Sequence, residues 1–233
     1  ELNYNRVGTA IGTYEASSEV NQFSSKFDHF WNNLNDAGLD VTMIDMTNWT
    51  SYTGYGLDMD ETKGLALFND ENKGKCALCH VLDSVDGVPP LFTDFSFDNL
   101  GTPKNPDNPW YVMDEEYLDD GTPINPEGAD WIDPGLGGFL ATHPNEYWSS
   151  MAQENWGKHK VPTLRNVGKI PGGEENKAYL HNGVFKSLKT VVNFYNTRDV
   201  ETWPPPEVAA NVNTAELGDL GLTSLEEDLI VRF

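Results

Sequence analysis

The chain has 233 residues, a length that allows one large domain or a small domain with elaborate extensions, and that suffices for a buried core. It carries 37 Asp and Glu against 15 Lys and Arg, a formal net charge of −22, so nucleic-acid backbones and anionic membrane surfaces would repel it. No run of 18 apolar residues occurs, so no membrane span is expected. The first six residues lack the pattern of a secretory leader, and we expect any export signal to have been removed or to lie outside this sequence.

The first predicted helix covers residues 7–31. Val7, Ile11 and Tyr14 recur at helical spacing, and an aromatic cluster follows them. We therefore expect this segment to carry the first apolar face of the fold. A polar loop over residues 36–56 should come next.

A second helix is predicted over residues 60–69. Asp58 or Asp60 can cap it, and Leu65 and Phe68 point to one side. This helix leads directly to the two cysteines of the chain.

Both cysteines lie in one pentapeptide, Cys76-Ala77-Leu78-Cys79-His80. A Cys-x-x-Cys-His run is the attachment site of a c-type haem, where two thiols add across the porphyrin vinyl groups and the histidine is the proximal iron ligand. A thioredoxin-like pair would need a βαβ context, a zinc site would need a second ligand pair, and a structural disulfide does not require His80. The motif therefore predicts one covalent haem c bound by Cys76, Cys79 and His80.

Residues 81–162 are dense in Pro, Gly, Asn and Asp, which predicts a long loop system. Aromatic residues are scattered through it, and disordered segments are poor in such residues. We therefore expect ordered loops whose rings pack around the haem edge and the domain surface. These rings are Phe92, Phe95, Phe97, Trp110, Tyr111, Tyr117, Trp131 and Phe139.

Two more helices are predicted after these loops. The first begins at the cap Ser187, and the second begins with a capping box of Thr223 and Glu226. No stop signal precedes the end of the chain, so we expect the sequence to be cut inside the last helix. The apolar residues on the two helices are Leu188, Val191, Val192 and Tyr195, and then Leu225, Leu229, Ile230 and Phe233.

Five blocks of the sequence occur in the order found in the bacterial dihaem cytochrome c peroxidase and MauG-like family. They cover residues 64–68, 76–80, 92–101, 160–167 and 179–183. The sequence resembles the C-terminal haem domain of that family, and residues 7–31 are similar to the helix that precedes it. Family members carry a second Cys-x-x-Cys-His motif in an N-terminal domain, which this sequence lacks.

The resemblance implies a mainly α fold, a class I cytochrome c-like haem domain with long ordered loops. It divides the chain into an N-terminal helix and connecting loop over residues 1–57, as a remnant of or link to a preceding domain, and a haem domain over residues 58–233.

The resemblance also places the sixth iron ligand at Tyr195, where family members carry Met or Tyr. A phenolate would stabilise ferric iron and lower the reduction potential, whereas a thioether would raise it. Two alternatives stay open. Tyr195 could be a core aromatic that closes an apolar helix face, and Met151 is the rival ligand.

Three further features are candidates for cofactor or metal binding. Arg165 is a candidate partner for a haem propionate, because a buried carboxylate needs a charged donor, or else a surface ion-pair residue. His181 is a candidate haem-pocket residue or a hydrogen-bonded loop histidine. Family members bind calcium between domains, and the corresponding stretch, residues 171–176, departs from the family pattern, so calcium is a candidate only.

The resemblance implies an oxidoreductase that receives electrons from a redox partner, such as a basic cytochrome or cupredoxin, and relays them toward peroxide reduction at a second haem domain or subunit. The alternative is a non-enzymatic monohaem electron-transfer cytochrome. A third class, a haem sensor, has no feature in the sequence that distinguishes it. No distal acid-base pair is recognisable, so no catalytic residue is assigned. The sequence therefore favours electron relay by this haem over a reaction of peroxide at it. Because c-haem attachment in bacteria follows export, a periplasmic or extracellular location is expected.

Overall fold

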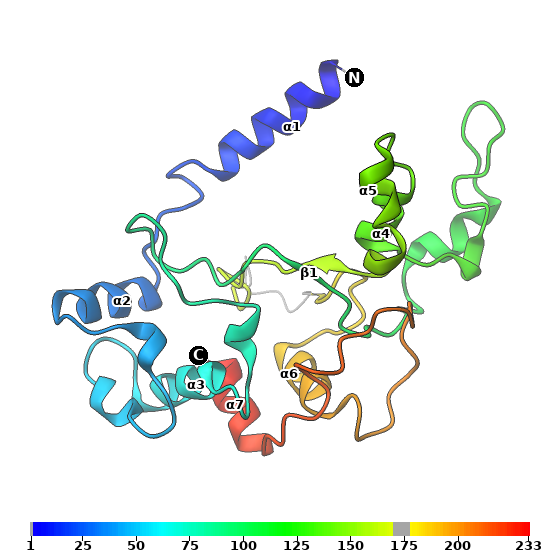
Figure 1. The fold of residues 1–233 in the computed structure, drawn as a ribbon. Coiled ribbons are helices and arrows are strands. Elements are labelled where there is room, and N and C mark those ends of the chain that lie inside the picture. Colours follow the sequence, from blue (N-terminus) through cyan, green and yellow to red (C-terminus); the bar gives the residue numbers. More distant parts are fainter. Residues whose placement is uncertain (1, 170–177) are drawn as a thin grey trace.

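The computed structural model describes residues 2–169 and 178–233, which form a mainly helical protein with long ordered loops, as predicted (Figure 1). In this described part, seven α-helices accompany a single two-stranded sheet. The helices are α1 (Leu2–Glu15), α2 (Lys26–Asp36), α3 (Met59–Asn69), α4 (Gly135–Ala141), α5 (Glu146–Ser150), α6 (Leu188–Thr197) and α7 (Ser224–Arg232). The strands β1 (Phe97–Asp98) and β2 (His159–Lys160) pair antiparallel, with Asp98 opposite His159.

The predicted continuous helix over residues 7–31 is wrong, because two helices, α1 and α2, occupy this region. Phe23 lies between them with a left-handed backbone, φ 46°, which an α-helix cannot contain. Ser25 then starts α2 with a capping box, in which its hydroxyl accepts from the Asp28 N–H and the Asp28 carboxylate accepts from the Ser25 N–H.

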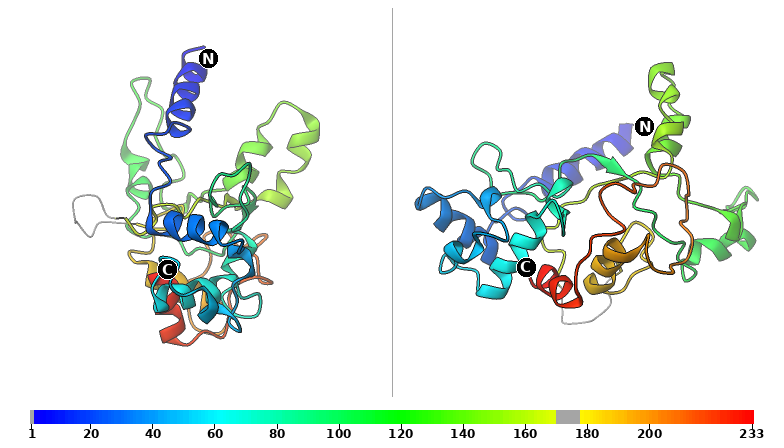
Figure 2. Two further views of the ribbon diagram at one scale, coloured as in Figure 1. Left: turned by 90° about the vertical axis from the view of Figure 1, so that its left-hand side faces the viewer. Right: turned by 60° about the horizontal axis from the view of Figure 1, so that its bottom comes forward.

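Helix α1 projects away from the body of the protein, as Figure 1 and the left view of Figure 2 show. The expected apolar face of this segment is therefore not buried. Val7, Ile11 and Tyr14 are 57, 53 and 59% exposed. Burial begins only with α2, whose Phe30 and Leu34 are fully enclosed.

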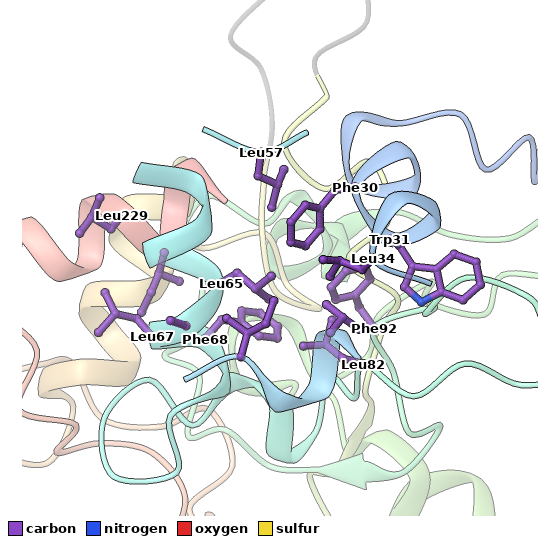
Figure 3. Packing of buried hydrophobic residues seen from close by; sticks show 14 of the residues in the cluster. Phe30, Trp31, Leu34, Leu57, Leu65, Leu67, Phe68, Leu82, Phe92 and Leu229 are labelled. Carbon is purple, nitrogen blue, oxygen red and sulfur yellow. The ribbon is translucent and has the colours of Figure 1, made fainter. Parts of the chain in front are cut away.

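The main core brings α2, α3 and α7 together (Figure 3). Leu65 and Leu67 of α3 are fully buried in it, and Leu229 of α7 is nearly so. Helices α3 and α7 approach so closely that a Cβ on Gly64 would lie 2.1 Å from the carbonyl oxygen of Leu229. Glycine at position 64 is thus a requirement of the packing, and this contact holds the end of the chain against the helix that leads to the haem motif.

The caps predicted for the three later helices are confirmed. The Asp58 side chain caps α3, the Ser187 hydroxyl caps α6, and Thr223 and Glu226 form the capping box of α7. Leu225 was expected on the apolar side of α7, but it is 66% exposed. The rest of that stripe packs in the main core.

The loop region contains two short helices that the sequence did not predict, α4 and α5, which form a projecting hairpin (Figure 1). Trp110 and Tyr111 each pack against Trp131, whereas Phe139 on the hairpin is 64% exposed. Within the described ranges, no helix has the length and apolar character needed to cross a bilayer. The division at residues 57 and 58 stays a prediction, and side chains from both sides of it share the main core.

Candidate haem site

The Cys-x-x-Cys-His motif forms a tight turn directly after α3. Gly74 lies so close to that helix that a Cβ would meet the carbonyl oxygen of Leu67 at 2.0 Å. Lys75, with a left-handed φ of 54°, then starts the 3-10 turn η3 (Cys76–Leu78). The His80 N–H donates to the Cys76 carbonyl at 2.9 Å, so the imidazole follows the first thiol by one turn.

Both thiols of the motif are free and therefore available for thioether bonds. Burial raises the pKa of Cys76 to about 12. Burial and the neighbouring carboxylates of Glu216 and Asp98 raise the pKa of Cys79 to about 12. Each sulfur thus carries its proton at neutral pH and is uncharged, so no unpaired thiolate lies at the motif.

His80 is oriented by a backbone carbonyl. Its Nδ1 lies 2.8 Å from the carbonyl oxygen of Phe92, which accepts the Nδ1 proton and leaves a lone pair on Nε2. Burial lowers the pKa of His80, against the opposing effect of the carbonyls of Phe92 and Pro162, so the ring is neutral near pH 7. A neutral imidazole with a free Nε2 lone pair is the form that ligates haem iron.

The loop that carries the Phe92 carbonyl is fixed on both sides. The hydroxyl of Thr93 donates to the Val161 carbonyl at 2.6 Å, and the hydroxyl of Thr163 donates to the Leu91 carbonyl at 2.5 Å. The Phe92 ring packs edge-on to aromatic rings of the main core, at centroid distances of 4.8 and 6.1 Å. Two blocks that are remote in the sequence therefore cooperate to orient the proximal histidine.

Of the two candidate distal ligands, Tyr195 is the one that the structure brings to the motif. Tyr195 on α6 packs against the main core, as does Cys76. Burial, together with the nearness of Cys76 and Cys79, raises the pKa of its hydroxyl. Met151 lies instead at the C-cap of α5, on the projecting hairpin.

Arg165 makes two strong contacts inside the protein. Its Nη1 donates to the Asp28 carboxylate at 2.6 Å, and its Nε and Nη2 donate to the Pro90 carbonyl at 2.9 and 2.6 Å. The guanidinium also faces the rings of Phe23 and Phe92. Arg165 therefore joins α2 to the loop beside His80, and its role toward a propionate stays a prediction.

His181 lies in a different group of side chains. Its ring stacks on that of His159, with centroids 3.7 Å apart, and its Nε2 lies 3.1 Å from a carboxylate oxygen of Glu207. His159 and Glu207 were missed because they are distant in the sequence and belong to no recognisable motif. The calcium stretch, residues 171–176, falls outside the described residues.

Two carboxylates beside the motif were also missed. Asp98, Glu216 and the Cys79 sulfur offer atoms that all lie within 4.8 Å of one another. The side-chain amide of Asn213 donates to both carboxylates at 2.5 Å and so fixes their positions. They place negative charge next to a haem attachment sulfur, and such charge favours the ferric state.

This donor set fits a covalently attached c-type haem, since it supplies two free thiols, a neutral imidazole with an available Nε2 and the partly buried phenol of Tyr195 near them. The fit depends on segments that α3, α6 and the loop at Phe92 bring together.

Comparison with known proteins found no protein-family model that matches the chain. The methylamine utilization protein MauG of Paracoccus denitrificans is 31% identical, over the whole of this chain and 51% of that protein. The cytochrome-c peroxidase IdrP1 of a Pseudomonas species is 26% identical, over 91% of this chain and 55% of that protein. The chain thus spans about half the length of these curated relatives.

Among solved structures, the fold is similar to that of the diheme peroxidase BthA from Burkholderia thailandensis, with a TM-score of 0.58 and 23% identity. The similarity covers 96% of this chain and 48% of that one.

Proposed function

We propose that this chain, which belongs to the family of MauG-like dihaem cytochrome c peroxidases, is the electron-accepting haem half of a peroxide-reducing oxidoreductase. The haem would be attached through Cys76 and Cys79 and ligated by Nε2 of His80. When bound, it supplies one-electron redox chemistry. The reaction with hydrogen peroxide would take place at a second haem, in another domain or subunit.

The position of Tyr195 carries this proposal. A side-chain ligand at the sixth position leaves no site where peroxide can bind, and a filled site is suited to electron relay. The raised pKa of Tyr195 means that its hydroxyl keeps its proton until a strong positive charge lies beside it. Ligation as a phenolate would therefore release one proton and favour the ferric state.

The surrounding residues act in the same direction. Asp98 and Glu216 add negative charge near Cys79, and the Phe92 carbonyl increases the basicity of His80. Asp98, Glu216 and the Phe92 carbonyl would each lower the reduction potential of the haem. The electron donor is proposed to be a basic cytochrome or cupredoxin, located with this protein in the periplasm or outside the cell, and calcium near residues 171–176 stays a proposal.

A second candidate function is a non-enzymatic monohaem electron-transfer cytochrome. The observation that favours it is the position of Tyr195 near the motif, since a haem with a filled sixth position has no open iron site for peroxide. The two functions share the haem site and differ only in whether a second haem takes part.

The Tyr195→Phe variant tests the ligand assignment, because it removes the phenol oxygen and keeps the ring. We expect its ferric absorption and electron paramagnetic resonance spectra to differ from those of the parent haem protein. Tyr52→Phe is the matched control, since Tyr52 also packs against the main core. An unchanged spectrum in Tyr195→Phe, with a changed one in Met151→Leu, would transfer the assignment to Met151.

Two measurements separate the two functions. The mass of the native, unprocessed protein counts its haems, and two haems are expected for a peroxidase half that has its partner domain. The reduced haem-loaded chain is then mixed with peroxide. Fast reoxidation with turnover by this chain alone contradicts a pure relay, and a native protein with one haem that stays inert supports the monohaem cytochrome.

A further inference from the structure

A second group of metal-ligating side chains lies outside the haem site. Asp133, His159 and His181 each offer one ligand atom, and these atoms all lie within 4.8 Å of one another. They come from three segments, namely the loop before α4, strand β2 and the turn that begins near residue 179. We propose that this Asp133-His159-His181 cluster binds one first-row divalent transition-metal ion, such as zinc, and that the ion ties the three segments together.

The ligand types decide the class of ion. Two imidazoles and one carboxylate suit zinc, copper, nickel or iron, whereas magnesium and calcium prefer sites made of oxygen alone. Burial, and then the charge of His181, lowers the pKa of His159. His159 is therefore neutral near pH 7, the form that donates a lone pair to a metal.

A buried carboxylate positions two of the three ligands. Glu207 has a side chain only 1% exposed, and its Oε2 lies 3.1 Å from Nε2 of His181. Its Oε1 accepts from the Asp133 backbone N–H at 3.2 Å. A carboxylate on one ring nitrogen orients a ligating histidine and raises its basicity. In the neutral ring, with the Nε2 proton donated to Glu207, the lone pair of His181 lies on Nδ1.

Glu207 is itself held in place. It accepts from the side-chain amide of Asn182 at 2.9 Å and from the Tyr111 hydroxyl at 3.2 Å. The hydrogen bonds from His181, Asn182 and the Asp133 backbone N–H outweigh the effect of burial and hold the pKa of Glu207 at about 2, so it stays ionised. A fixed, charged, buried carboxylate behind two ligands is the support that a metal site requires.

Binding would need a local rearrangement. Zinc bonds to nitrogen and oxygen are about 2.0–2.2 Å long, so ligand atoms around the ion lie roughly 3.3 Å apart. The rings of His159 and His181 now stack with only 9° between their planes, and they must tilt apart to aim at one ion. The His181 side chain is 17% exposed, so an ion can reach the cluster from solvent.

The haem-loaded chain, freed of adventitious metal with a chelator, is the material for the test. Zinc is titrated by calorimetry, and elemental analysis then gives the ratio of zinc to haem iron. We expect about one zinc per iron and a melting temperature that rises with zinc, since an ion that binds only the folded state stabilises it.

Four variants distinguish this site from other metal binding. His159→Ala and Asp133→Asn should each weaken zinc binding at least about tenfold, and Glu207→Gln should weaken it about 10- to 100-fold. His143→Ala is the matched control, because His143 contacts Phe139 and Trp148 on the α4–α5 hairpin, and it should bind zinc like the parent.

The proposal is overturned if the parent retains no stoichiometric zinc, or if His159→Ala binds zinc as tightly as the parent. A loss of zinc affinity in His143→Ala as large as that in His159→Ala would also overturn the proposal. Asp133→Asn guards against a folding artefact, because an asparagine can still accept from the Gly135 N–H as Asp133 does. An unchanged ferric haem spectrum and circular dichroism confirm that a variant is folded.

Discussion

At the residue scale, the ion pair between Arg165 and Asp28 connects α2 to the loop beside the haem site. Asp28 is 1% exposed, and it accepts from Ser25 as well as from Arg165. Burial raises its pKa, but these hydrogen bonds and the positive charge outweigh burial and hold the pKa below its ordinary value of 3.8. The carboxylate is therefore ionised in the folded protein and depends on its partners.

Replacing Arg165 with methionine should leave the Asp28 charge buried and unpaired. Breaking one side of a buried pair costs about 3–5 kcal/mol, so we expect a loss of this size in the free energy of unfolding of Arg165→Met at pH 7, measured with urea. Arg232→Met is the control, because the Arg232–Asp58 pair is about half exposed and its loss should change the free energy of unfolding much less.

The contribution of Asp28 to the free energy of unfolding should decrease as pH falls. A carboxyl group whose folded-state pKa is depressed contributes stability above its unfolded pKa and loses it as pH falls through the folded value. For Asp28, this loss begins near pH 3.8 and continues below it.

The double variant Asp28→Asn/Arg165→Met removes both charges of the ion pair. It should recover much of the free energy of unfolding that Arg165→Met loses at pH 7, and no recovery would show that the unpaired Asp28 charge is not the cause.

At the element scale, the approach of α3 to α7 depends on the missing side chain of Gly64. Gly64→Ala puts a Cβ against the Leu229 carbonyl oxygen, and the helices must separate. Overpacking of this kind costs about 1–3 kcal/mol, which urea unfolding of the haem-loaded protein would measure.

Gly8→Ala on the projecting helix α1 is the matched control, since nothing lies within 4 Å of the position where its Cβ would be. Alanine there favours the helix by about 1 kcal/mol and should not destabilise the fold. An equal loss in both variants would contradict the packing argument.

Local patterns in the sequence predicted the elements that have clear caps. Residues 60–69, Ser187 and the capping box at Thr223 mark helices that the structure confirms. The prediction of one helix over residues 7–31 is wrong because apolar residues continue past Ser25, although Ser25 and Asp28 have the spacing of a capping box that starts a new helix. Exposure could not be predicted either, since the apolar spacing on α1 does not reveal whether a partner surface exists.

The same distinction between local patterns and long-range contacts holds for the candidate haem site. Cys76, Cys79 and His80 are adjacent in the sequence, so a motif identifies them. The Phe92 carbonyl, the carboxylates of Asp98 and Glu216, and the stacking of His159 on His181 arise from contacts between remote segments. Only the folded chain reveals them, because no local spacing encodes a long-range contact.

At the scale of the whole molecule, the net charge of −22 should act on association with a redox partner. Attraction between an acidic protein and a basic cytochrome raises the association rate, and salt screens it over a Debye length of about 10 Å at 0.1 M. We expect the second-order rate of electron transfer from such a donor to fall about tenfold or more between 10 mM and 0.5 M ionic strength. Stopped-flow spectroscopy of the haem measures this rate, and an uncharged small reductant is the control that should show little change. A rate independent of salt would show that the acidic surface does not steer a partner and would favour its alternative role as a solubility surface suited to a saline habitat.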